Sequence, residues 1–184
     1  LGRKHLKRNA DMIENMYLTS PACVCTLMGP EHTYGLVNES YQKLFGTRKI
    51  VGKPILEALP ELEGHGFDII LDNVYQTGEI FLGNEILIWL AYDEGLAPAE
   101  RYFNFSYQPI FDEDNQITGI LVFGYEVTEQ IFARRMRQED ADRFRTLAEV
   151  MPQKMNTTDV EGNVDYMNQQ WFDYTQMSFE QLKD

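Results

Sequence analysis

The sequence has 184 residues, of which 43% are hydrophobic, and its net charge at pH 7 is −13. A chain of this length can bury one well-packed core with flanking pieces, but two complete domains would be a tight fit. The strong negative charge argues against nucleic acid as a partner. The longest apolar runs are far shorter than the roughly 20 residues that cross a bilayer, so no membrane span is predicted.

The two cysteines indicate the cellular compartment. Cys23 and Cys25 stand two residues apart in a predicted strand, where a disulfide between them would be badly strained. Free thiols are typical of a reducing environment, and no basic segment followed by an apolar segment marks the chain for export. These features predict a cytoplasmic protein. The lack of an initiating Met indicates a piece of a longer chain.

An amphipathic helix is predicted for residues 1–20, because apolar or small side chains recur every three or four positions. The residues of this face are Leu6, Ala10, Ile13 and Tyr17. The helix ends at Ser20, since a residue that precedes proline avoids the helical region. Strands are then predicted at residues 23–27 and 33–37, joined by a turn at Gly29.

Helices are predicted after the second strand. Asn38 begins a short helix that Gly46 stops, and about one helical turn fits between Pro54 and Pro60. A longer helix follows, because apolar residues recur with the i, i+3, i+4 spacing of a buried stripe. This stripe consists of Phe67, Ile70, Leu71, Val74 and Tyr75. Gly78 stands where a C-terminal cap belongs.

Three further strands are predicted at about residues 82–89, 103–107 and 117–127. In the second of them aromatic residues alternate with polar ones, and the third is rich in β-branched and aromatic residues. The acidic stretch 112–115 forms a hairpin loop between them. Two strands, several helices and then three strands define an α+β domain in which an antiparallel sheet packs its helices on one face.

Short motifs occur at characteristic places in this order of elements. Asn38 opens the helix after the hairpin, Gly46 follows eight residues later, and Val51-Gly52-Lys53-Pro54 comes next. Glu126-Val127-Thr128 closes the last strand. This ordered set resembles the PAS family, in the branch found in bacterial sensor histidine kinases, over roughly residues 17–128. PAS domains typically end in Asp, an aliphatic residue and Thr, so Glu126 departs from the pattern but keeps the carboxylate.

The resemblance implies a PAS fold, with a five-stranded antiparallel sheet and helices on one face, complete over residues 21–128. Residues 129–150 are predicted to form a connector helix, because apolar residues again recur at helical spacing. An internal repeat at an offset of 130 places Asn168 on Asn38. Residues 151–184 therefore resemble the truncated start of a second PAS domain.

Six aromatic residues are candidates for the lining of a pocket in the first domain. They come from the helix and strands that would enclose a PAS pocket: Phe67, Tyr75, Trp89, Phe103, Phe105 and Phe123. Such residues also serve as ordinary core filling, and both interpretations remain open. If the pocket exists, it would accept a small apolar ligand.

The motif Glu126-Val127-Thr128 is the candidate signal relay, since the resemblance implies that its acid anchors the last strand to the exit helix. Thr128 is a suitable N-cap for a helix that begins at Glu129. Glu126 could pair with a basic group such as Arg134. The alternative is that Thr128 is only a helix cap and carries no signal.

Catalytic, metal and cofactor sites are not predicted. The three histidines fit no catalytic pattern, and Cys23 and Cys25 lack the second pair of ligands that a metal site requires. His65 lies where some PAS domains bind haem, but the acidic residues around it disfavour haem propionates. No reactive flavin-type cysteine motif, phosphoacceptor-histidine block or ATP-binding glycine box is present. We therefore expect no enzymatic activity in this stretch.

The sequence thus predicts a sensory and signal-relay PAS module of a multi-domain protein, of the two-component sensor histidine kinase type. It would form a homodimer through its flanking helices and pass a ligand or partner signal along the connector helix. The alternative is a ligand-independent dimerisation module within a kinase or a cyclic-dinucleotide enzyme.

Overall fold

The computed structural model describes Met12 and residues 15–183. The chain divides into two compact units: unit 1 ends at Thr128 and unit 2 begins at Glu129. The predicted helix over residues 1–20 lies mostly outside the described residues, but residues 15–19 are helical. The hydroxyl of Tyr17 donates a hydrogen bond of 3.3 Å to the carbonyl of Val24. Even this short stretch is therefore tied to the first strand.

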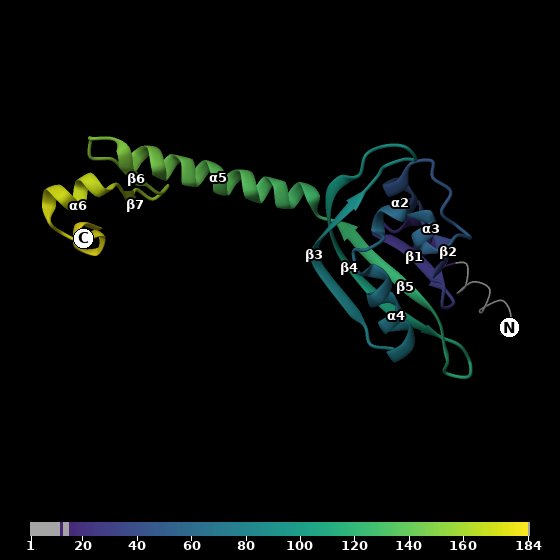
Figure 1. The fold of residues 1–184 in the computed structure, drawn as a ribbon. Coiled ribbons are helices and arrows are strands. Elements are labelled where there is room, and N and C mark those ends of the chain that lie inside the picture. The colour runs from purple at the N-terminus through teal and green to yellow at the C-terminus, as the bar shows by residue number, and fades with distance from the viewer. Residues whose placement is uncertain (1–11, 13–14, 184) are drawn as a thin grey trace. The chain divides into compact units, whose positions relative to one another are not determined.

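Unit 1 contains one five-stranded antiparallel sheet (Figure 1). Its strands, in spatial order, are β2 (Thr33–Val37), β1 (Cys23–Met28), β5 (Ile117–Glu126), β4 (Ala99–Phe111) and β3 (Phe81–Leu90). All four neighbouring pairs are antiparallel. The first and last strands of the domain therefore lie side by side at its centre. The predicted α+β class and the five-stranded antiparallel sheet are confirmed.

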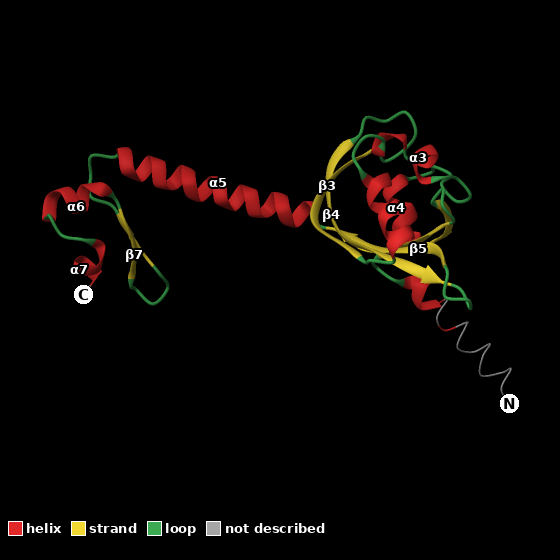
Figure 2. Cartoon of the chain, turned by 60° about the horizontal axis from the view of Figure 1, so that its bottom comes forward, coloured by secondary structure: helices red, strands yellow, loops and turns green. Residues whose placement is uncertain are grey.

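The short helices between β2 and β3 cover one face of the sheet (Figure 2). They are α2 (Glu39–Gln42), α3 (Ile55–Ala58), α4 (Phe67–Thr77) and the 3-10 turns η1 (Lys43–Phe45) and η2 (Pro60–Leu62). The longest of them, α4, buries Phe67, Leu71 and Val74, which belong to the predicted stripe. Gly78 ends α4 in the left-handed region at φ 76°, a conformation that suits glycine.

The core of unit 1 lies between this helical layer and the inner face of the sheet. Strand residues Cys25, Leu27 and Ile120 are fully buried there, and they pack with Phe45 and Leu71 from the helices. Because side chains alternate along a strand, the buried Ile120 and Val122 direct their neighbour Phe123 to the opposite face. The inner face is thus apolar and closed.

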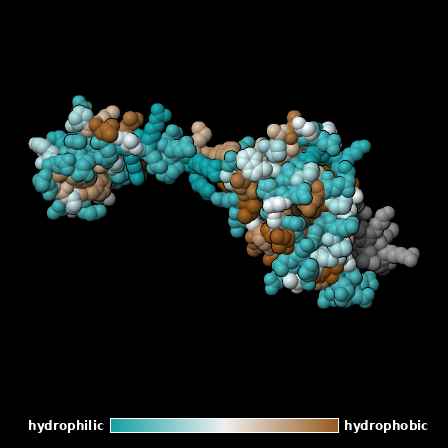
Figure 3. Space-filling model, viewed as in Figure 1, coloured by the Kyte–Doolittle hydropathy of each residue, from teal (hydrophilic) through white to brown (hydrophobic). Residues whose placement is uncertain are grey.

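The outer face of the sheet leaves large hydrophobic side chains exposed. Phe123, Tyr125 and Leu82 line a shallow groove of about 170 Å³ on it. Trp89 on β3 is also 43% exposed. Hydrophobic side chains are accordingly visible among hydrophilic ones at the surface of unit 1 in Figure 3. Such a surface is typical of an interaction site.

Unit 2 contains most of the long helix α5 (Thr128–Val150), a hairpin and two short helices. The hairpin consists of β6 (Asn156–Thr158) and β7 (Val164–Met167), and α6 (Gln169–Thr175) and α7 (Phe179–Lys183) follow it. Helix, hairpin and helix occur in the order that the repeat predicts. The interpretation of residues 151–184 as the start of a second PAS domain remains a prediction.

Candidate functional site

A small cavity of about 60 Å³ lies in unit 1 between the helices and the inner face of the sheet. Its walls are mostly apolar and come from both layers: Cys23, Tyr41, Leu44, Phe45, Ile55, Leu59, Leu62, Phe67, Ile88, Leu90, Phe103, Phe105, Tyr107, Val122 and Gly124. Pockets for drug-sized ligands usually measure about 300–1,000 Å³. In this conformation the cavity therefore suits only a very small molecule.

Three of the six aromatic residues proposed as pocket lining are at this cavity. Phe67 comes from α4, and Phe103 and Phe105 come from β4. Tyr75 is instead half-buried beside His32, with ring centroids 5.9 Å apart.

The expectation for Trp89 and Phe123 is corrected by the structure. They are 43% and 44% exposed because their strand neighbours, Ile88 and Val122, face inward and line the cavity in their place. A β-bulge between Gly83 and Ile86 sets which residues of β3 face inward.

Sequence reasoning missed the polar residues of the cavity. Tyr41, Tyr107 and Cys23 line it, and the hydroxyl of Tyr41 lies 2.9 Å from that of Tyr34. Burial raises the pKa values of the Tyr41 and Tyr107 phenols well above their ordinary range, so both keep their protons and can donate hydrogen bonds. Burial, and then the negative charge of Glu126, raise the pKa of the Cys23 thiol to about 11.

The motif Glu126-Val127-Thr128, which we call the exit junction, is tied to β4. The N–H of Val127 donates to the carbonyl of Tyr102 at 2.7 Å. The N–H of Tyr102 donates to the hydroxyl of Thr128 at 2.9 Å, and this hydroxyl donates to the carboxylate of Glu126 at 2.7 Å. The Thr128 side chain therefore links a central strand to the start of α5.

The first residue of α5 and the partner of the Thr128 hydroxyl differ from the sequence-based expectation. Helix α5 begins at Thr128 and not at Glu129, and the Thr128 hydroxyl accepts its hydrogen bond from Tyr102 of β4. Glu126 forms an ion pair with Arg101, at 3.6 Å, which adds a second link to the same strand. Both partners come from a strand distant in sequence, which explains why helix-capping rules did not find them.

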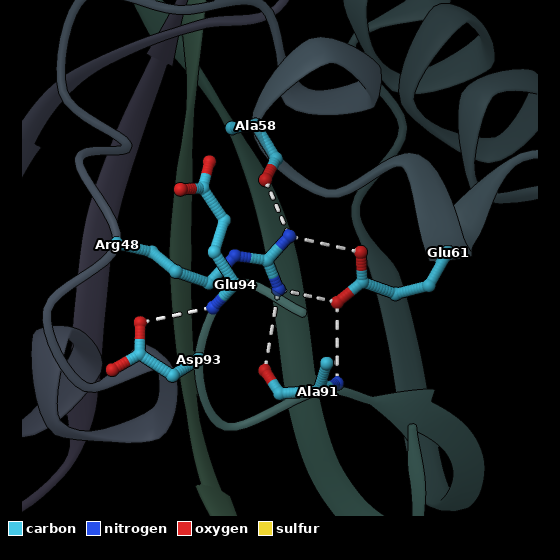
Figure 4. Close-up of polar contacts among 6 residues, drawn as sticks. All are labelled: Arg48, Ala58, Glu61, Ala91, Asp93 and Glu94. Carbon is cyan, nitrogen blue, oxygen red and sulfur yellow. Dashed lines mark hydrogen bonds and ion pairs between the residues drawn. The ribbon is translucent and has the colours of Figure 1, made fainter. Parts of the chain in front are cut away.

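A buried ion pair between Arg48 and Glu61 lies near the end of β3 (Figure 4). The two guanidinium nitrogens reach the two carboxylate oxygens at 2.6 and 3.1 Å. Arg48 also donates to the carbonyls of Ala58 and Ala91, and the N–H of Ala91 donates to Glu61. This pair therefore fastens the loop after α2, the α3–η2 segment and the end of β3 to one another.

The haem hypothesis for His65 finds no support in its position. Its side chain is exposed in the turn before α4, and Nδ1 lies 3.1 Å from the carbonyl of Glu63. His65 is not among the residues that line the cavity. Within the described part of the chain, no group of three or more potential ligands is placed to hold a metal ion. No helix among these residues is long and apolar enough to cross a membrane.

A five-stranded antiparallel sheet that closes a small cavity against short helices, with a helix leaving its last strand, defines an α+β domain. A family model described as PAS fold matches residues 19–131, well over half of the chain. The chain belongs to the PAS family.

Solved structures are similar to this chain at low sequence identity. A sensory box sensor histidine kinase from Vibrio cholerae is 23% identical, with 69% of this chain and 95% of that chain covered, but its TM-score of 0.43 is too low to support the fold. A PAS domain from Colwellia psychrerythraea is 14% identical, with 65% of this chain and 98% of that chain covered and a TM-score of 0.51. The Vibrio cholerae protein VqmA bound to DPO is 18% identical, with 62% of this chain and 56% of that chain covered and a TM-score of 0.50. At such identities the likeness shows the fold alone.

Proposed function

We propose that this chain is the sensory and signal-relay part of a larger cytoplasmic signalling protein, of the two-component sensor histidine kinase type. The observation that carries the proposal is the exit junction, in which Thr128 joins β4 to the start of α5. A shift of β4 moves the N–H of Tyr102, and the hydrogen bond transfers this movement to the helix. Catalysis then belongs to other parts of the parent protein.

The sensor is the core cavity. Its apolar walls and its phenol groups, from Tyr41 and Tyr107, suit a compact, mainly apolar molecule with one or two hydrogen-bonding atoms. Cys23 connects the cavity with the last strand, because it lines the cavity and pairs with Gly124 of β5, two residues before Glu126. The structure of VqmA bound to DPO supports ligand binding by a protein with a related fold.

The exit junction is weak enough to switch. The Arg101 and Glu126 side chains are partly buried, at 20% and 34% exposed, and their charged groups lie 3.6 Å apart; ion pairs at the surface contribute only about 0–1 kcal/mol. The hydrogen bond that Thr128 accepts from Tyr102 adds about 1 kcal/mol, and the one that it donates to the Glu126 carboxylate adds about 1.5–3 kcal/mol. A ligand that binds one arrangement of β4 better by a few kcal/mol is sufficient to shift the equilibrium.

The test uses the full-length parent with Glu126→Gln or Thr128→Ala. We expect both variants to fold and to change the ratio of autophosphorylation with and without stimulus. Glu129→Gln, an exposed residue one position further along α5, is the matched control. If both variants leave output unchanged in the two conditions, the relay role is wrong.

A second candidate function is a ligand-independent dimerisation module. The exposed hydrophobic side chains of the outer sheet face favour it, and a homodimer through the flanking helices is compatible with both functions. Trp89→Ser with Phe123→Ser tests this candidate by sedimentation. A dimer that dissociates in this variant, together with unchanged output in cavity-filling variants such as Val122→Ile, would favour dimerisation over sensing.

The output domain distinguishes the two parent classes. A phosphoacceptor-histidine helix and an ATP-binding domain in the same polypeptide would agree with the proposed kinase. A nucleotide-cyclase domain would contradict it and would favour a cyclic-dinucleotide enzyme.

A further inference from the structure

A similar buried asparagine arrangement occurs in both units, although only the Asn38 side chain also caps the helix that follows it. Asn38 in unit 1 and Asn168 in unit 2 are each 0% exposed, and each stands just before a helix that follows a hairpin. Their backbone angles are nearly equal, with φ and ψ of −81° and 169° for Asn38 and of −78° and 166° for Asn168. A fully buried carboxamide requires partners for its polar atoms.

The Asn38 side chain joins the incoming segment to the first strand. Its oxygen accepts from the N–H of Val24 at 3.0 Å, and its nitrogen donates to the carbonyls of Tyr17 at 3.2 Å and Ala22 at 2.8 Å. Tyr17 belongs to the helical stretch that leads into unit 1. One side chain thus holds the end of an incoming helix against β1.

Asn168 repeats these contacts in unit 2. Its oxygen accepts from the N–H of Met155 at 2.9 Å, and its nitrogen donates to the carbonyls of Ala148 and Gln153, each at 2.8 Å. Ala148 lies in the last turn of α5 and is buried. The connector helix therefore enters unit 2 as the N-terminal segment enters unit 1.

Three further contacts fasten the end of α5 to the hairpin and to the start of α6. The carboxylate of Glu149 accepts a hydrogen bond of 2.6 Å from the hydroxyl of Tyr166 and one of 2.7 Å from the N–H of Gln169. The rings of Phe144 and Tyr166 have centroids 5.9 Å apart. Rotation or translation of α5 must therefore move β7 and the start of α6 or break these hydrogen bonds.

We infer that Asn168, Glu149 and Tyr166 form a receiving joint, through which the hairpin and α6 of unit 2 follow the position of α5. The inference rests on the proposed relay function and adds its second end, since the exit junction delivers the movement and the receiving joint takes it up. Asn168 fixes the backbone of the last turn, and Glu149 and Tyr166 transfer its displacement to the hairpin. All three are positioning residues.

The experiment follows amide hydrogen exchange in the full chain. Thr128→Val removes the hydroxyl of the exit junction while keeping the shape of the side chain. We expect exchange in residues 156–167 to change by about fivefold, the factor that corresponds to one hydrogen bond. The same substitution is then made together with Tyr166→Phe, which removes the hydrogen bond to Glu149, or with Glu149→Gln, which removes the charge and weakens both hydrogen bonds of Glu149. Both changes leave the Asn168 contacts in place.

Three outcomes separate the two hypotheses. The receiving joint is supported if Thr128→Val alters exchange of the hairpin in the parent chain and in the control Glu139→Gln, but at most weakly in the joint variants. It is overturned if the effect of Thr128→Val is the same in Tyr166→Phe and Glu149→Gln as in the parent. If Thr128→Val has no effect on unit 2 even in the parent chain, the proposed relay itself fails, and the joint fails with it.

Discussion

The guanidinium of Arg48 meets the carboxylate of Glu61 in a two-pronged ion pair in which both side chains are 10% exposed or less. Parallel hydrogen bonds of this kind are stronger than single ones and fix the orientation of both groups. Backbone groups of Ala58 and Ala91 complete the arrangement. The pair therefore holds together three segments that border the helical layer of unit 1.

Arg48→Ala should destabilise unit 1 by about 3–5 kcal/mol, because it leaves the Glu61 carboxylate buried without its partner. Urea denaturation followed by circular dichroism measures the change. The control is Lys43→Ala, which removes the exposed pair with Glu39 and should cost under about 1 kcal/mol. A loss from Arg48→Ala as small as that of the control would mean that the buried pair contributes no more than a surface one.

The double variant Arg48→Met with Glu61→Leu should be less destabilised than the sum of the two single changes, because no unpaired charge remains. It should not regain full stability, since the carbonyls of Ala58 and Ala91 lose their donors. The same denaturation experiment provides the coupling energy. Additive single effects would contradict the ion pair.

Glu61 should make the stability of unit 1 depend on acid pH. Burial by itself raises the pKa of this carboxyl, but the hydrogen bonds from Arg48 and Ala91 outweigh burial and the pKa is lowered. A carboxyl whose pKa is lowered by folding stabilises the folded state at pH values above its pKa in the unfolded chain, which is about 4.3. This contribution is lost as the pH falls below that value toward the pKa of the folded state. Denaturation at several pH values between about 3 and 6 should show a steeper fall for the parent than for Glu61→Gln. Parallel curves would exclude a role of Glu61.

Both cysteine thiols should resist modification in the folded chain. Burial is the main cause that raises the pKa of Cys23 to about 11, and it also raises the pKa of the fully buried Cys25. At pH 8 only about one Cys23 in a thousand would be a thiolate, the reactive form. A disulfide reagent should react slowly with both thiols when the chain is folded in buffer. It should react with both thiols readily when the chain is unfolded in urea. Rapid reaction of one thiol without denaturant would show that the cavity wall opens.

Asn38→Ala should destabilise unit 1 by about 3 kcal/mol, because several buried backbone groups lose their partner. Asn38→Asp should be at least as harmful, since its carboxylate would face the carbonyls that now accept hydrogen bonds from the amide. The exposed Asn73 of α4 provides the control, and Asn73→Ala should change stability by under about 0.5 kcal/mol. Equal effects at the two sites would rule out a structural role for Asn38.

The cavity illustrates where sequence reasoning succeeded and where it failed. Phe67 and Phe103 were found because helical and strand periodicity placed them on apolar faces. Trp89 and Phe123 were assigned to the wrong face, because aromatic character alone does not reveal which phase of a strand points inward. In β3 a bulge resets that phase, and Gly83 was the local sign of it, since a glycine inside a strand often marks a bulge.

By itself, the sequence determined the order of the elements, the antiparallel sheet and the buried stripe of α4. These features follow from periodicity and from turn residues, which act over a few neighbouring positions. Only the tertiary structure decided that Arg48 pairs with Glu61, that Thr128 meets Tyr102 and that Asn168 holds the end of α5. The two residues of each contact lie between 13 and 26 positions apart in the sequence. Contacts between distant segments depend on how the packed layers bring backbone groups together. The spacing of residues within one segment does not reveal that arrangement.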